Sequence, residues 1–206
     1  MDVNLQLVRE FFELNLFRVL TNWQQPGEHR AQLFVENSVP MAGPEREFVL
    51  RPADLSSLEC AVVELRAWHA DRFYPSLIEA NPGFGDFTKE EALALAREVF
   101  GPRTLTTILV ISEMPATADQ RQRSVELLQA LGVHHVLEFP TVLQDLLAKV
   151  SVNGVYAASQ TLQTLRLLKR YRLVRHQQME LTFAADVGRL PSTGKVEAIA
   201  TEEEES

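Results

Sequence analysis

The stretch Thr106-Thr107-Ile108-Leu109-Val110-Ile111 decides the fold of this 206-residue chain. Its last four residues are all apolar, which is typical of a strand covered on both faces, as in a parallel sheet. After it, the sequence alternates between helical and strand patterns, and we expect a helix over 118–131, a strand over 133–139 and a helix over 140–150. This half of the chain therefore predicts parallel α/β units.

Upstream, three short strand patterns are separated by prolines and glycines. They cover residues 31–36, 47–51 and 61–68 and predict an antiparallel meander. Before them, apolar residues recur at helical spacing over 3–24, so we expect one long central helix there. Between the meander and the parallel half, we expect a loop over 74–88 and then a helix over 88–101.

The C-terminal part combines a basic helix with an acidic end. The spacing over 157–179 predicts an amphipathic helix, and the basic residues that share its polar arc are Arg166, Lys169, Arg170 and Arg172. The chain closes on four consecutive glutamates, a charge block typical of a disordered segment. We therefore expect a single α/β domain over 1–180, which includes the basic helix 157–179, and a flexible acidic tail over 181–206.

Composition narrows the class of protein further. The net charge of -8 argues against a surface that is basic throughout. The single cysteine, Cys60, excludes an intrachain disulfide and a zinc site built from several cysteines. No apolar run reaches the roughly 18 residues that a membrane-spanning helix needs, and Asp2 and Glu10 stand where a secretory signal would be basic. We expect a cytoplasmic protein with no membrane segment.

The strand patterns of the meander carry the charged residues that could do chemistry. Glu64 and Arg66 are two positions apart within 61–68, so they point to the same face of that strand. Glu47 lies in the preceding strand pattern. Carboxylate oxygens are suitable ligands for Mg²⁺, and hydrolysis of a phosphodiester requires its charge to be neutralised while water attacks.

The order helix, three-strand meander, helix, strand, helix, strand over about residues 5–150 resembles the PD-(D/E)xK nuclease superfamily. That resemblance implies a mixed sheet flanked by helices, with a restriction-endonuclease-like core of order α-β-β-β-α-β and, here, an additional strand and helices. It implies an acid on the second strand and an acid-x-lysine motif on the third, which together bind Mg²⁺. On this alignment Glu47 is the first acid, Glu64 and Arg66 form the motif, and Glu10 of the first helix adds a metal ligand.

Arginine replaces the motif lysine in this sequence, and the replacement bears on function. Arg66 cannot lose its proton near neutral pH and so cannot act as a base, although it can hold a phosphate oxygen. The resemblance therefore implies a protein that processes DNA or RNA, with cleavage weakened or lost. The alternative is a non-enzymatic interaction or regulatory protein on a nuclease-like or Rossmann-like α/β scaffold.

Other interpretations of the same residues stay open. Asp54 competes with Glu47 for the role of first acid, and Glu64 and Arg66 can form a same-face ion pair without chemical function. The basic helix can bind a nucleic acid, an acidic protein partner or the acidic tail, or it can be a solvated face. His69, Asp71 and Arg72 follow the third strand pattern, where active-site loops are often found, and His69 could carry a proton there.

Overall fold

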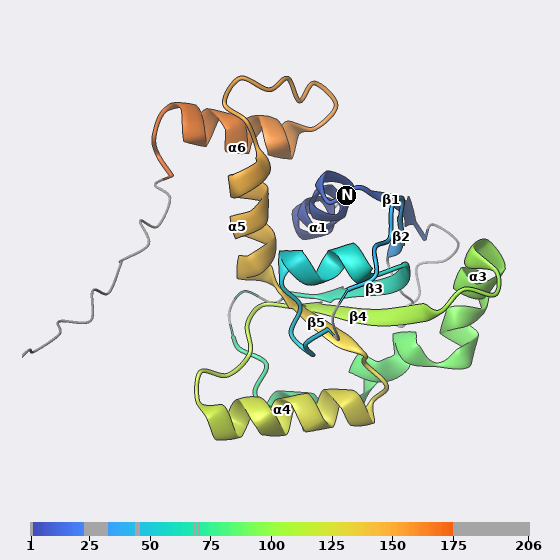
Figure 1. Ribbon diagram of the computed structural model, residues 1–206. Coiled ribbons are helices and arrows are strands. Elements are labelled where there is room, and N and C mark those ends of the chain that lie inside the picture. The colour runs from blue at the N-terminus through green and yellow to red at the C-terminus, as the bar shows by residue number, and fades with distance from the viewer. Residues whose placement is uncertain (1, 23–32, 44–45, 68, 70, 175–206) are drawn as a thin grey trace, which may run out of the picture. The chain divides into compact units, whose positions relative to one another are not determined.

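Strand β3 (Cys60–Arg66) lies at the centre of a five-stranded sheet with the order β1-β2-β3-β4-β5 (Figure 1). On one side of β3, β4 (Leu105–Ile111) and β5 (His135–Glu138) run parallel to it. On the other side, β2 (Leu33–Asn37) pairs antiparallel with β3, and β1 (Phe17–Thr21) pairs antiparallel with β2. The expected α/β class with a mixed sheet is therefore confirmed.

This computed structural model describes residues 2–22, 33–43, 46–67, 69 and 71–174. Met1–Val174 form one compact unit. The expected acidic tail over 181–206 and the last part of the helix expected over 157–179 lie outside the described residues. Within the described ranges, no helix has the length and apolar character that crossing a membrane requires.

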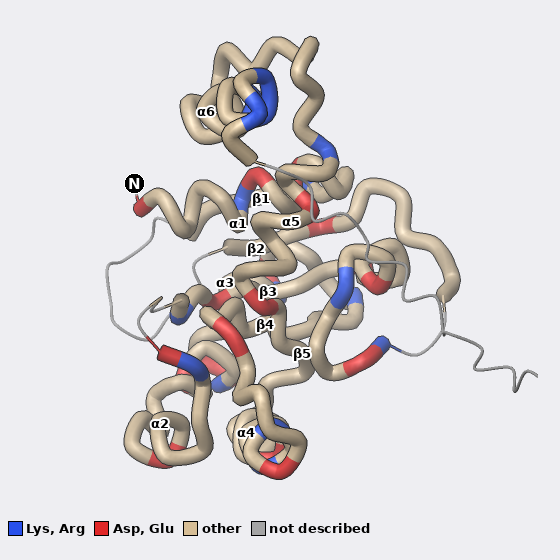
Figure 2. The backbone as a smooth tube through the Cα atoms, turned by 90° about the vertical axis from the view of Figure 1, so that its left-hand side faces the viewer, with Lys and Arg blue, Asp and Glu red and all other residues tan. Residues whose placement is uncertain are grey.

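Helices cover both faces of the sheet. On one face lie α1 (Val3–Leu14) and α5 (Phe139–Lys149), and α6 (Gln160–Arg170) packs against both of them. The other face is covered by α2 (Pro75–Ala80), α3 (Glu90–Phe100) and α4 (Ala118–Ala130). Figure 2 shows α2 and α4 on the side of the sheet opposite to α1, α5 and α6.

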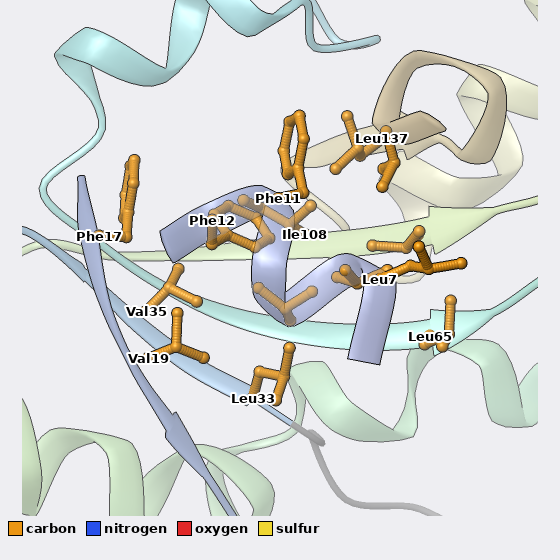
Figure 3. Close-up of a cluster of buried hydrophobic side chains, with 14 of the residues drawn as sticks. Leu7, Phe11, Phe12, Phe17, Val19, Leu33, Val35, Leu65, Ile108 and Leu137 are labelled. Carbon is orange, nitrogen blue, oxygen red and sulfur yellow. The ribbon is translucent and has the colours of Figure 1, made fainter. Parts of the chain in front are cut away.

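The alternation of side chains along β3 explains the two layers. Ala61, Val63 and Leu65 belong to the apolar cluster under α1 and α5, whereas Cys60 and Val62 belong to the cluster under α3 and α4. Figure 3 shows side chains of α1 lying against strand residues of the first cluster. A strand buried on both faces is apolar at nearly every position, which is why Glu64 stands out in it.

The helix expected over 3–24 is wrong in its second half. Helix α1 ends at Leu14, Leu16 adopts a left-handed conformation with φ 66°, and the chain continues as β1. Asn15 ends the helix, because its side-chain Nδ2 donates to the carbonyl of Phe11 at 2.8 Å and to Asp145 Oδ2 at 2.8 Å. Alternate residues of β1 are then buried, as a strand with one solvent-facing side requires.

The strand expected over 47–51 is also wrong. In this segment only Val49 pairs with the sheet, through an isolated parallel bridge to Val136 of β5. Backbone hydrogen bonds of 2.8 Å from Leu50 N to Val136 O and from Val136 N to Phe48 O hold it at the outer edge of β5. A short 3₁₀ helix, η1 (Pro52–Ser57), follows directly, and proline at its start ends the extended stretch.

The meander therefore consists of β1, β2 and β3. The expected strands over 31–36 and 61–68 correspond to β2 and β3, while β1 comes from the segment expected to be helical. The expected loop over 74–88 contains α2 and a second 3₁₀ helix, η2 (Pro82–Thr88). The helix expected over 88–101 is α3, and the parallel half is confirmed as β4, α4, β5 and α5.

Candidate functional site

Glu64 and Arg66 meet on β3, as their spacing predicts. Glu64 Oε1 lies 3.0 Å from Arg66 Nε, and 3% of the Glu64 side chain and 24% of the Arg66 side chain are exposed. In the parallel register, Glu64 pairs with Leu109 of β4. The carboxylate therefore lies in the apolar interior beside the α2, α3 and α4 layer, with one cation next to it.

The surroundings of Glu64 make its protonation sensitive to pH near neutrality. Burial disfavours the charged form and raises the pKa of Glu64 to about 7, although the charge and the hydrogen bond of Arg66 act in the opposite direction. Its second oxygen, Oε2, is buried and makes no hydrogen bond to the described residues. A carboxyl group with a raised pKa and one unused oxygen marks a candidate functional site.

Glu47 lies far from this pair. Its carboxylate is exposed and accepts hydrogen bonds of 3.0 and 2.9 Å from Arg51 Nη2. The register runs from Val49 through β5 and β4 to Glu64, which is three strand spacings, about 14 Å. The carboxylates of Glu47 and Glu64 are therefore too far apart to bind the same metal ion.

Glu10 lies on the opposite face of the sheet, on α1. Its Oε1 accepts from Gln6 Nε2 at 2.6 Å and from the hydroxyl of Ser159, the N-cap residue of α6. The competing acid Asp54 caps η1, because its Oδ2 accepts from Arg51 N at 2.8 Å. Each of these carboxylates thus has a local structural partner.

The residues implied by the resemblance do not fit one magnesium ion as a set. Magnesium requires several oxygen ligands in a compact octahedron, whereas Glu47, Glu64 and Glu10 lie in three separate places. Among the residues that the structure describes, no three His, Cys, Asp or Glu side chains are gathered where they could share a metal.

Two of the four basic residues expected to bind nucleic acid have structural contacts. Lys169 Nζ donates to the carbonyls of Leu147 and Val150 at 2.5 and 2.6 Å, at the C-terminus of α5. Arg166 Nη1 lies 3.5 Å from the carbonyls of Val152 and Gly154 in the loop between α5 and α6. Arg170 and Arg172 are exposed.

A crevice with a volume of about 450 Å³ opens at the carboxyl ends of β3, β4 and β5. Its lining residues come from the segments that directly follow these three strands: His69, Asp71, Arg72, Tyr74, Ser112, Glu113, Phe139, Pro140 and Leu143. The sequence indicated the first three, at the end of the strand expected over 61–68. Ser112 and Glu113 were missed, although they follow the strand expected at 106–111 and parallel strands carry binding residues at these ends.

Short contacts hold the walls of this crevice together. Ser112 Oγ donates to the carbonyl of Asp71 at 2.5 Å, and Phe73 N donates to the carbonyl of Glu113 at 2.8 Å. Arg72 Nε lies 3.0 Å from Glu113 Oε2. The segments after β3 and β4 therefore form one connected wall.

The opposite wall begins at α5. The ring of Phe139 meets the ring of His69 edge to face, with centroids 4.6 Å apart. His69 Nε2 lies 3.2 Å from Asn4 Oδ1. Because that amide oxygen can only accept, Nε2 is the donor in this contact.

A second cavity, of about 610 Å³, lies at the amino-terminal edge of the same strands. Arg46 and His135 line it, and Arg46 Nη1 donates to the carbonyl of Ser57 at 2.7 Å. Burial lowers the pKa of His135, although its hydrogen bond to the carbonyl of Glu47 raises it in part. Glu47 is thus a neighbour of this edge and not of Glu64.

The fold defines a class of protein, a mixed-sheet α/β protein with helices on both faces. Comparison with protein families, with curated proteins and with solved structures finds no match to the chain.

Proposed function

We propose that this protein acts by binding and not by cleavage, as a non-enzymatic interaction protein on a nuclease-like α/β scaffold. The observation that carries the proposal is the ion pair of Glu64 with Arg66 at the position where the resemblance implies a metal ligand and a catalytic lysine. A carboxylate neutralised by a neighbouring guanidinium is a weaker ligand for a cation, and the guanidinium is not a base.

The order of elements supports the nuclease-like part of this proposal. Helix α1, strands β1 to β3, helix α3 and strand β4 follow in the order of a restriction-endonuclease-like core, and β5 is the additional strand. On this assignment the second strand is β2, whose acid is Glu36. Glu36 pairs with Arg18 and Arg103, and its register partner on β3 is Cys60, four positions from Glu64.

The proposal is tested by single-turnover cleavage of a labelled duplex and a labelled single strand in Mg²⁺ and in Mn²⁺. We expect no cleavage from the wild type and none from Arg66→Lys, together with no saturable Mn²⁺ binding by calorimetry. Cleavage that appears in Arg66→Lys and disappears when Glu64→Gln is added would overturn the binding role. The double variant is the matched control, because it retains the new lysine.

A second candidate function, processing of DNA or RNA with weak cleavage, is favoured by the exposed Arg170 and Arg172. If it holds, Arg66→Lys should raise cleavage by about 10² to 10⁴, the usual contribution of acid-base assistance. The double variant Arg170→Gln, Arg172→Gln should also reduce the salt slope of nucleic-acid binding by about 0.7 to 0.9 per lost phosphate contact. Unchanged cleavage and an unchanged slope contradict it.

A further inference from the structure

The crevice at the carboxyl ends of β3, β4 and β5 follows from the topology of the sheet. The connections after β3 and β4 pass to the face covered by α2, α3 and α4, whereas the chain after β5 passes to the opposite face as α5. Neighbouring connections that leave for opposite faces separate at the strand ends, and α/β proteins bind ligands in the gap between them. Here the gap is lined from both sides. One side is formed by His69, Asp71, Arg72, Tyr74, Ser112 and Glu113, and the other by Phe139, Pro140 and Leu143.

The charges that line the crevice do not cancel. Arg72 is neutralised by Glu113 at 3.0 Å. Asp71 accepts a hydrogen bond of 2.8 Å from Arg72 N through Oδ1, and among the described residues its carboxylate has no cationic side chain within ion-pair distance. His69 is the other ionisable side chain of this lining, and the acids and Arg72 together leave one uncompensated negative charge, that of Asp71.

The remaining lining is suited to hydrocarbon. Pro140 and Leu143 offer apolar surface next to the ring of Phe139. Tyr74 adds an aromatic ring that can face a cation. A ligand that matches both sides has a cationic head and an apolar stem.

We propose that this crevice binds an organic cation, an ammonium or guanidinium group on a hydrocarbon stem, with the head at Asp71 and the stem against Pro140 and Leu143. This inference rests on the binding role proposed above and names the chemistry of what is bound. The cation can be a free small molecule or a basic side chain of a protein partner, and the two share the same recognition.

The test is calorimetric titration of the full chain with n-butylguanidine, a guanidinium on a four-carbon hydrocarbon stem. We expect saturable binding by the wild type and at least about 10-fold weaker binding by Asp71→Asn, because a charge-assisted hydrogen bond is lost while the size and the Oδ1 acceptor remain. Glu98→Gln removes an exposed acid on α3 and should bind as the wild type does. N-butylurea, which has a similar shape without the charge, should bind at least about 10-fold more weakly than n-butylguanidine.

A blocked peptide with one arginine among glycines and serines distinguishes the two sources. Tighter binding of n-butylguanidine identifies a free cation, tighter binding of the peptide identifies a partner's side chain, and either result supports the site. No saturation by n-butylguanidine or by the peptide up to about 10 mM, about tenfold weaker than a millimolar Kd, overturns the proposal. Equal binding by Asp71→Asn overturns it as well. The cleavage assay above tests the binding role separately, since Asp71 takes no part in it.

Discussion

The carboxyl group of Glu64 gives the fold a dependence on pH that differs in sign from that of most acids. Its pKa is raised from 4.5 to about 7, first by burial, and Arg66 only partly offsets the effect. The folded state therefore keeps a proton that the unfolded state has already released between these two values. The contribution of this proton to the free energy of unfolding is fully present below pH 4.5 and is lost as the pH rises through about 7.

Replacement of Glu64 by glutamine should remove this pH dependence. The shift from 4.5 to about 7 corresponds to about 3 kcal/mol of unfolding free energy, at about 1.4 kcal/mol per pK unit, present at pH 4.5 and absent at pH 8. Urea unfolding at both pH values measures it, and the difference between wild type and Glu64→Gln isolates it from the other acids. Glu98→Gln, on the surface, should follow the wild type. If the free energy of unfolding changes with pH in the same way for wild type and Glu64→Gln, the carboxyl group of Glu64 is not the source of the pH dependence.

At the scale of the element, α1 and β1 show why a helix was predicted where a strand forms. Phe17 and Val19 satisfy helical spacing together with the residues before them, yet they also alternate as a strand does. What decides between the two is Asn15, whose side chain bonds Asp145, 130 positions away. No local pattern contains that contact, nor the pairing of β1 with β2.

The left-handed residue between α1 and β1 should tolerate a better-suited side chain. Leu16 is 68% exposed and has φ 66°, a conformation that costs an ordinary side chain about 1 to 2 kcal/mol and asparagine less. Leu16→Asn should therefore stabilise the protein by about 0.5 to 1 kcal/mol in urea unfolding. Leu20→Asn, within β1, should destabilise it, because asparagine is poor in strands. A loss of stability in Leu16→Asn would contradict the strain argument.

The junction of α5 and α6 depends on Lys169. Its ammonium group bonds two carbonyls at the C-terminus of α5, where the helix dipole also favours a cation. Lys169→Met retains the stem and removes the charge, so we expect a loss of about 1 to 2 kcal/mol in unfolding free energy. Arg170→Gln, one residue further on and exposed, should change it by less than about 0.5 kcal/mol. Equal effects of the two substitutions on the free energy of unfolding would show that Lys169 does not cap α5.

The candidate site was predictable only where its residues share one element. The period of two along β3 brings Glu64 and Arg66 together, and the sequence predicts this. The position of Glu47 depends on whether 48–50 joins the meander or the edge of β5, and only the tertiary structure decides that. The sequence predicts only part of the crevice lining. His69, Asp71 and Arg72 follow one strand, whereas Ser112 and Glu113 lie next to them only because β4 pairs in parallel with β3.

On the scale of the whole molecule, two apolar clusters on opposite faces of the sheet hold the fold together. Their buried members lie between Leu7 and Leu162, inside the unit Met1–Val174. A chain that ends at Val174 should therefore have a free energy of unfolding within about 0.5 kcal/mol of that of the full chain. A chain that ends at Val150 also loses Leu162 and the contacts of Lys169, and should be less stable by about 2 to 5 kcal/mol. Thermal and urea unfolding measure the stability of both shortened chains. A large loss of stability in the chain that ends at Val174 would show that the residues after it contribute to stability.

The ion pair of Glu64 with Arg66 also limits which substitutions these two positions can accept during evolution. Loss of Glu64 alone leaves a guanidinium that is only 24% exposed without its carboxylate, and loss of Arg66 alone leaves a buried acid without its cation. Descendant lineages are therefore expected to keep both residues or to replace both by apolar ones. The exceptions are Arg66→Lys and Glu64→Asp, the single exchanges that keep both charges.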